Sequence, residues 1–163
     1  MFENVFCRLL LSVLILMMPL AGMAAETADK ESQAQEWGIM LGLFTRHVSP
    51  SKNTNDDTEF LGLSYSDWVV QRFSNSYHER SFFGGKRFHT KKLGYPRNRN
   101  FFIQVNLYAG LLQGYGDRFP NFDGVTPVAM PTVGFGYKKT AIEVLYVPTP
   151  SGGVFTSFFT FRF

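Results

Sequence analysis

The end of the chain alternates between aromatic and polar residues. The last ten residues read Val-Phe-Thr-Ser-Phe-Phe-Thr-Phe-Arg-Phe. Four aromatic residues occupy odd positions and three polar ones occupy even positions: Phe155, Phe159, Phe161 and Phe163, then Thr156, Thr160 and Arg162. A period of two predicts a β-strand with one apolar face. Because that face is almost purely aromatic, it favours a lipid boundary over a soluble core.

Similar alternation recurs along the chain and predicts eight strands. The predicted strands cover residues 37–44, 60–65, 68–73, 81–89, 101–111, 132–137, 141–147 and 154–163. Between them we predict loops at 49–58, 74–80, 113–130 and 148–153 and turns at 66–67, 90–100 and 138–139. An even number of amphipathic strands predicts an all-β fold, an eight-stranded antiparallel transmembrane β-barrel over residues 37–163.

The start of the chain has the features of a targeting segment. A basic residue precedes the apolar run Leu9 to Leu20, and small residues follow it. The run is too short to span a membrane, so we predict a signal peptide over residues 1–24, removed after Ala24. Residues 25–36 form a polar segment. With the Phe-terminated strand, these features predict the outer membrane of a Gram-negative bacterium, membrane lipids as partners, and insertion by the outer-membrane assembly machinery.

The composition of the chain limits which cofactors and partners we expect. Cys7 is the only cysteine and lies in the signal segment, so the mature protein has no disulfide or cysteine metal site. Three histidines and scattered carboxylates show no ligand spacing, and we expect no metal and no cofactor. A net charge of +3 without a nucleic-acid motif gives no reason to expect nucleic-acid binding. We expect a monomer or dimer.

Strand counting places several reactive side chains at one end of the barrel. If the last strand ends in the periplasm, His47 and the pair Asn75-Ser76 lie on the same outer rim. A serine hydroxyl needs a nearby base to attack an ester, and histidine is the commonest one. His78 and Glu79 lie in the same predicted loop. Alternation would point His47 outward unless a bulge intervenes, and a lone histidine at a strand end is more often a solvated residue.

Several segments resemble the lipid A palmitoyltransferase family. Val133-Gly134-Phe135-Gly136, followed by Val144 to Pro148 and the Phe-rich end, looks like that family's C-terminal third. The segments Pro127 to Pro131, Thr45-Arg46-His47 and Phe73 to Tyr77 are similar to its Pro-Val-x-x-Pro, its histidine segment and its Phe-Lys-Asp-Ser-Trp segment. The similarity is close only towards the C-terminus.

The resemblance implies an activity and its residues. The family transfers a palmitoyl chain from a glycerophospholipid to lipid A, inside an eight-stranded barrel that measures acyl length. It would make His47 the base and Ser76 its hydroxyl partner, with Asn75 where the family has aspartate. Glu79 would then be the only carboxylate able to substitute. Gly84 or Gly85 would correspond to the glycine that sets acyl length.

Prolines and arginines near the rim suggest how lipids would bind. Proline cannot donate to a strand ladder, so Pro127, Pro131 and Pro148 predict broken pairing between the sixth and seventh strands. That break would admit a lipid chain, although the prolines would also suit simple strand ends. Rim arginines suit lipid phosphates: Arg46, Arg72 and Arg80.

A noncatalytic barrel with a structural or binding role is the alternative function, favoured by the missing aspartate. Lipid A deacylation is disfavoured because the late strands have no His-x-Ser pair.

Overall fold

The computed structural model describes residues 35–48, 55–57, 59–90, 92–95, 98–116, 119–149 and 152–163. The predicted signal peptide and most of the predicted polar segment lie outside these residues. The described part contains no helix long and apolar enough to cross a membrane.

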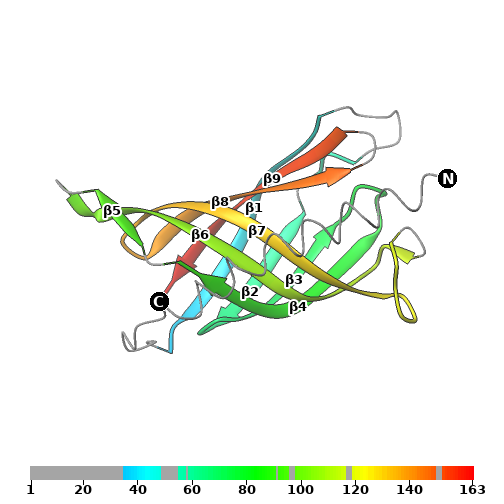
Figure 1. Ribbon diagram of the computed structural model, residues 1–163, viewed down its shortest axis with the longest axis horizontal. Helices are drawn as coiled ribbons and strands as arrows, with labels where there is room; N and C mark the ends of the chain where they lie inside the picture. Colours follow the sequence, from blue (N-terminus) through cyan, green and yellow to red (C-terminus); the bar gives the residue numbers. More distant parts are fainter. Residues whose placement is uncertain are drawn as a thin grey trace. The chain divides into compact units, whose positions relative to one another are not determined.

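Nine β-strands make up the described structure. They are β1 (Trp37–His47), β2 (Phe60–Tyr65), β3 (Trp68–Ser74), β4 (Arg80–His89), β5 (Leu93–Tyr95), β6 (Asn98–Gln113), β7 (Val125–Tyr137), β8 (Thr140–Thr149) and β9 (Gly152–Arg162). Every pairing is antiparallel, in the order β4-β3-β2-β1-β9-β8-β7-β6-β5 (Figure 1).

Pairing between β4 and β6 closes the sheet on itself. β4 pairs with β6 from Phe82↔Gln113 to His89↔Asn106, and the short β5 continues along the same edge of β6. β4 and β5 therefore occupy one strand position. The prediction of an all-β, eight-stranded antiparallel barrel is confirmed at this level. A closed barrel leaves no unpaired edge over most of its circumference.

Three predicted connections are wrong in extent. The predicted loop at 148–153 is too long, because β8 runs to Thr149 and β9 begins at Gly152, and these two residues pair. The predicted turn at 90–100 contains β5 and the start of β6. The predicted loop at 113–130 is also too long, because β7 begins at Val125 and pairs with Gln113. Pro127 and Pro131, taken as strand breakers, lie inside β7 at outward-facing positions. Proline is compatible with a strand where its missing N–H does not face a paired neighbour.

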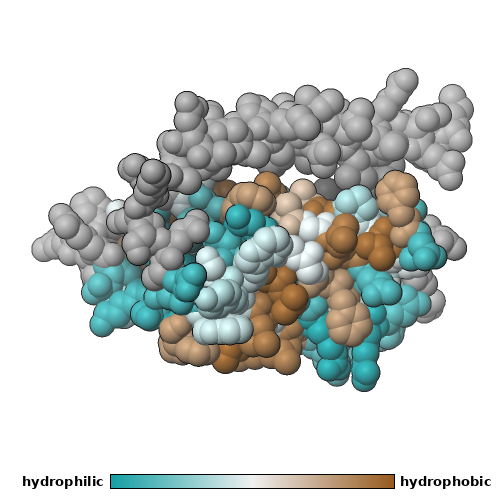
Figure 2. Space-filling model, turned by 90° about the horizontal axis from the view of Figure 1, so that it is seen from below, coloured by the Kyte–Doolittle hydropathy of each residue, from teal (hydrophilic) through white to brown (hydrophobic). Residues whose placement is uncertain are grey.

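The two faces of the wall differ sharply. Large apolar side chains that are exposed on the outside come from most of the strands: Leu41, Leu63, Val70, Phe82, Leu111, Phe135, Ile142 and Phe161. Figure 2 shows hydrophobic side chains across the middle of one face, with hydrophilic ones towards its two ends. The inward positions alternate with these and are buried, as the period of two requires.

The lumen is filled by side chains of two kinds. An apolar cluster consists of Met40, Val69, Phe83, Tyr108, Leu112 and Phe158, and Phe60, Phe73 and Tyr115 pack against it. Next to this cluster the filling is polar. Glu143 is buried and its Oε2 accepts hydrogen bonds from Asn106 Nδ2 at 2.8 Å, Tyr108 Oη at 2.9 Å and Thr132 Oγ1 at 2.8 Å. The apolar cluster and this polar network meet at Tyr108, which belongs to the cluster and donates to Glu143.

Candidate functional site

A β-bulge turns His47 into the barrel. β1 pairs with β9 as Gly42↔Phe158 and then Phe44↔Ser157, so Leu43 has no partner in this register. One extra residue reverses the alternation of side chains beyond it. His47 is therefore only 8 % exposed. Without the bulge, the alternation of side chains along β1 would point this histidine outward.

His47 lies between a carboxylate and a serine hydroxyl. Its Nε2 is 3.0 Å from Ser76 Oγ, and its Nδ1 is 2.5 Å from Asp56 Oδ1. The backbone N–H of His47 also donates to Asp56 Oδ1, at 3.2 Å. A hydroxyl, an imidazole and a carboxylate joined in this order form the arrangement that activates a serine for attack on an acyl group.

The carboxylate of Asp56 is held ionised by its neighbours. The side-chain hydrogen bond from His47 is the largest cause that lowers the pKa of Asp56 below 3.8, and Arg46 adds a smaller attraction. Arg46 Nη1 lies 3.9 Å from Asp56 Oδ2. An ionised carboxylate beside Nδ1 stabilises the positive charge that an imidazole acquires when it takes a proton. Arg46 thus contacts the aspartate of the site.

Asn55 fixes the loop that carries Asp56. Asn55 is 4 % exposed, and its Nδ2 donates to Ser74 Oγ at 2.9 Å and to the Asn75 carbonyl at 3.1 Å. Its backbone N–H donates to the Ser76 carbonyl at 3.0 Å. These bonds tie the connection after β1 to the turn after β3. Asp56 and Ser76 are therefore positioned relative to each other by one buried amide.

Asn75 holds the serine turn from its other side. Its Oδ1 accepts from the backbone N–H groups of Tyr77 at 2.9 Å and Glu79 at 3.0 Å. Its Nδ2 donates to Ser81 Oγ at 3.1 Å and to the Gly114 carbonyl at 2.7 Å. Both ends of the amide are used in this way, and its bonds run to the turn and to the end of β6. The side chain of Asn75 therefore holds the turn that carries Ser76, and it is not hydrogen-bonded to His47.

Sequence reasoning missed Asp56. The expectation that only Glu79 could supply the third group is wrong, because Asp56 contacts His47 directly. The available signal in the sequence was the run Asn55-Asp56-Asp57. Its first carboxylate, Asp56, comes nine residues after His47. Strand periodicity carries no information on how such a loop folds back, so spacing alone did not single it out.

The two candidate glycines face opposite ways. Gly84 is exposed on the outside of β4, whereas Gly85 lies against β6, where its Cβ would come 2.3 Å from the Ala109 carbonyl oxygen. The Phe83 ring would lie 2.7 Å from that Cβ. An acyl chain reaching Gly85 would have to displace this ring. Arg80 is exposed at the start of β4, opposite Ser74 at the end of β3.

The wall is unpaired between the rim ends of β7 and β8. The β7–β8 ladder runs from Tyr137↔Thr140 only as far as Thr132↔Leu145, although β7 continues back to Val125 and β8 on to Thr149. The two strands diverge beyond that point (Figure 1). The unpaired segments hold Pro127 and Pro131 in β7 and Pro148 in β8. The predicted break in pairing is present where these prolines lie.

Comparison with models of protein families gives no match, and comparison with curated protein sequences gives none either. The fold and the geometry of the rim therefore carry the functional argument.

Proposed function

We propose that the protein is an outer-membrane acyltransferase that moves a long acyl chain, such as palmitoyl, from a glycerophospholipid to lipid A. The contact chain Ser76–His47–Asp56 is the observation that carries the proposal. Three groups from separate segments of the chain converge in the order needed for acyl transfer, and two buried asparagines hold two of those segments. A noncatalytic barrel would not need this order.

The chemistry follows from the positions of the protons. His47 Nε2 takes the Ser76 hydroxyl proton as Ser76 Oγ attacks the ester carbonyl of the donor. The carbon–oxygen bond to glycerol then breaks, and the departing oxygen takes the proton from Nε2. In the second half of the reaction, a hydroxyl of the acceptor loses its proton to His47 Nε2 and attacks the acyl group. The bond between the acyl carbon and Ser76 Oγ then breaks, and Oγ takes the proton from Nε2, which restores the Ser76 hydroxyl. Asp56 stabilises the imidazolium that exists in each half of the reaction.

The outside of the barrel supports a place in a bilayer. Exposed contiguous apolar surface on a soluble monomer is normally limited to a few hundred Å². Here exposed large apolar residues are found on most of the strands, and the inward positions of the wall include many polar residues. A transmembrane barrel has this alternation of apolar outside and polar inside.

The unpaired segments of β7 and β8 support a route for the donor. A lipid in the surrounding leaflet needs a lateral opening to place an acyl chain in the lumen, and strand pairing would block one. The opening reaches the same end of the barrel as His47. The apolar cluster in the lumen, which includes Met40 and Phe158, suits a hydrocarbon chain once its side chains rearrange.

The test is transfer by the purified protein in detergent micelles. Phosphatidylethanolamine with a labelled palmitoyl chain is the donor and lipid A the acceptor, and mass spectrometry identifies the products. We expect lipid A with one added acyl chain, and loss of this product in Ser76→Ala and His47→Ala. His89→Ala, which changes a histidine at the opposite end of the barrel, is the matched control and should remain active.

The other outcomes are equally distinct. Labelled free fatty acid without acylated lipid A would mean hydrolysis and would reject lipid A as the acceptor. No product from the wild-type protein, together with unchanged lipid A in cells that express it, would favour the noncatalytic barrel.

A further inference from the structure

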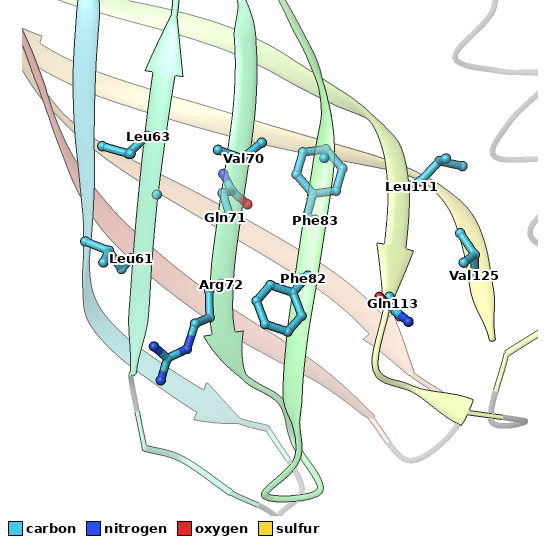
Figure 3. A pocket seen from close by; sticks show the side chains of 12 residues that line it. Leu61, Leu63, Val70, Gln71, Arg72, Phe82, Phe83, Leu111, Gln113 and Val125 are labelled. Carbon is cyan, nitrogen blue, oxygen red and sulfur yellow. The ribbon is translucent and has the colours of Figure 1, made fainter.

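A groove of about 530 Å³ lies on the outer wall of the barrel across β2, β3, β4 and β6 (Figure 3). Its volume is in the range of small-molecule and lipid sites, about 300–1,000 Å³. Apolar side chains that are exposed on the outside form its walls: Leu61, Leu63, Val70, Phe82 and Leu111. An outer wall of regular strands would ordinarily be covered by such side chains without a depression.

Gly84 accounts for the depression. It pairs with Val70 on one side and with Leu111 on the other, so the row of outward side chains has a gap at this position. A Cβ added at Gly84 would meet no atom within 4 Å. The groove is therefore open because residue 84 has no side chain. Backbone crowding, which explains a glycine at 85, does not require one at 84.

The end of the groove nearest the rim is polar and cationic. Arg72 and Gln113 line it, and both are exposed. Arg80 lies two residue pairs closer to the rim, where it pairs with Ser74. Within the described residues, neither arginine side chain forms an ion pair. An apolar trough ending at two exposed guanidinium groups complements an anionic lipid, with phosphate at the arginines and hydrocarbon in the trough.

This polar end leads directly to the catalytic turn. β3 and β4 run on past Arg72 and Phe82 to the Ser74↔Arg80 pair, and Ser76 lies in the connection that follows. A lipid chain held in the groove therefore keeps its head group beside Ser76. The opening between β7 and β8 is separate from this groove. The wall between them is closed, because β6 pairs with β7 along the whole length of β7.

We propose that the groove binds one acyl chain of the acceptor, a phosphorylated glycolipid of the lipid A class, with Arg72 on a phosphate. This inference rests on the proposed transferase function. A transferase must hold two lipids at one serine. The donor needs to pass only a single chain through the β7–β8 opening. The acceptor carries several chains under a large head group, so it is held on the outer wall, where Gly84 makes room for one of them.

The experiment measures binding in a protein that cannot turn over. Ser76→Ala protein in detergent micelles is irradiated with lipid A that carries a photoreactive group in one acyl chain, and cross-linked peptides are mapped by mass spectrometry. We expect labels at Val70 and Leu111, and displacement by unlabelled lipid A. Adding Gly84→Leu fills the groove and should lower this labelling about tenfold or more. Gly94→Leu makes the same substitution at an exposed glycine of β5, outside the groove, and should leave labelling unchanged.

A second variant tests the charge. Arg72→Gln should weaken the binding of lipid A and leave unchanged the labelling by lipid A from which the phosphates have been removed. The β-sheet circular dichroism of each variant verifies that it is folded.

Several results would overturn the inference. Labels spread evenly around the outer wall would mean contact with surrounding lipid only, and labels confined to lumen residues such as Phe158 would place the acceptor inside. Groove labelling in a protein whose wild-type form transfers no acyl chain would reject the transferase function and leave the lipid site standing. Transfer without groove labelling would reject the groove alone.

Discussion

Asp56 contacts His47 through one carboxylate oxygen, which accepts from the His47 backbone N–H at 3.2 Å and lies 2.5 Å from ring Nδ1. A carboxylate at this position assigns the proton to Nδ1, so that the lone pair of Nε2 faces Ser76 Oγ at 3.0 Å. The same oxygen thus sets both the position of the backbone and the tautomer of the ring. A base in this tautomer can accept the hydroxyl proton of Ser76.

Asp56→Asn should lower the rate of acyl transfer by roughly 10²- to 10⁴-fold. The amide either leaves the imidazolium without its counter-charge or favours the tautomer with the proton on Nε2, which cannot accept from Ser76. The measurement is initial rate in the micelle assay with donor in excess. Asp57→Asn removes the same charge one residue away and is the matched control, because Asp57 is exposed and contributes its backbone N–H to Asn55.

Equal rates in the two aspartate variants would remove Asp56 from the mechanism. His47 and Ser76 would then act as a pair, and the proximity of the carboxylate would have only a structural meaning.

The titration of Asp56 should reveal its contact with His47. The hydrogen bond from His47 lowers the pKa of Asp56 below 3.8. Because the folded-state pKa is depressed, the stabilisation from this contact is present above pH 3.8 and is lost as the pH falls through the folded value. Carboxyl ¹³C NMR should therefore find Asp56 ionised throughout the range in which transfer is assayed, with a midpoint below 3.8.

His47→Ala removes the main cause of the shift and should raise the Asp56 midpoint towards 3.8. Asp67, at the far end of the barrel beside Arg87 and His89, serves as the internal reference. A midpoint of Asp56 that does not respond to His47→Ala would show that the two groups are not in contact in solution.

Asn75 should behave as a positioning residue. Asn75→Ala removes both acceptor bonds to the turn and should lower kcat. Asn75→Asp keeps the oxygen that faces the N–H groups of Tyr77 and Glu79, but it places an oxygen where Nδ2 donates to the Gly114 carbonyl at 2.7 Å. Replacing a buried hydrogen-bond donor in this way lowers the free energy of unfolding by about 1–3 kcal/mol. We therefore expect Asn75→Asp to lower both the melting temperature and kcat, with its pH profile unchanged.

Asn121→Asp is the matched control for Asn75, because Asn121 also holds a loop through both ends of its amide, in the connection between β6 and β7. It should lower stability without lowering kcat. Higher activity in Asn75→Asp than in wild type would contradict the positioning role and would assign residue 75 the part of a carboxylate.

The strands could be predicted from sequence because their signal is local. The bounds of β2 and β3 were reproduced to within one residue, since a period of two in outward-facing and lumen-facing positions repeats within each strand. Strand counting also placed His47 and Ser76 on the same rim, but their contact depends on the β-bulge between Gly42 and Phe44, which alternation did not predict. Asp56 could not be found in this way, since its position depends on Asn55 bonding to a turn about 20 residues farther along the chain.

The start of β7 was missed for a related reason. Proline is a general strand breaker, so Pro127 and Pro131 predicted a loop. Whether a proline is tolerated depends on which neighbour its nitrogen faces, and that is fixed by tertiary pairing. The same residues nevertheless predicted the missing half of the β7–β8 ladder, because one side of β7 is paired with β6 and the other is not.

A reversible bond across that opening should control access of the donor. Extending the Thr132↔Leu145 register by two residues places Met130 opposite Val147. Cysteines at these two positions, oxidised to a disulfide, would close the opening, and the chain's only native cysteine, Cys7, lies in the predicted signal segment. We expect transfer from phospholipid to fall at least about tenfold on oxidation and to return on reduction.

A control pair places the bond where the strands already pair. Val133 and Val144 lie opposite each other within the ladder, so cysteines there should form a disulfide that leaves transfer unchanged. If the Met130–Val147 disulfide also left transfer unchanged, the donor chain would have to reach Ser76 over the rim. The proline-bearing segments of β7 and β8 would then only begin and end their strands.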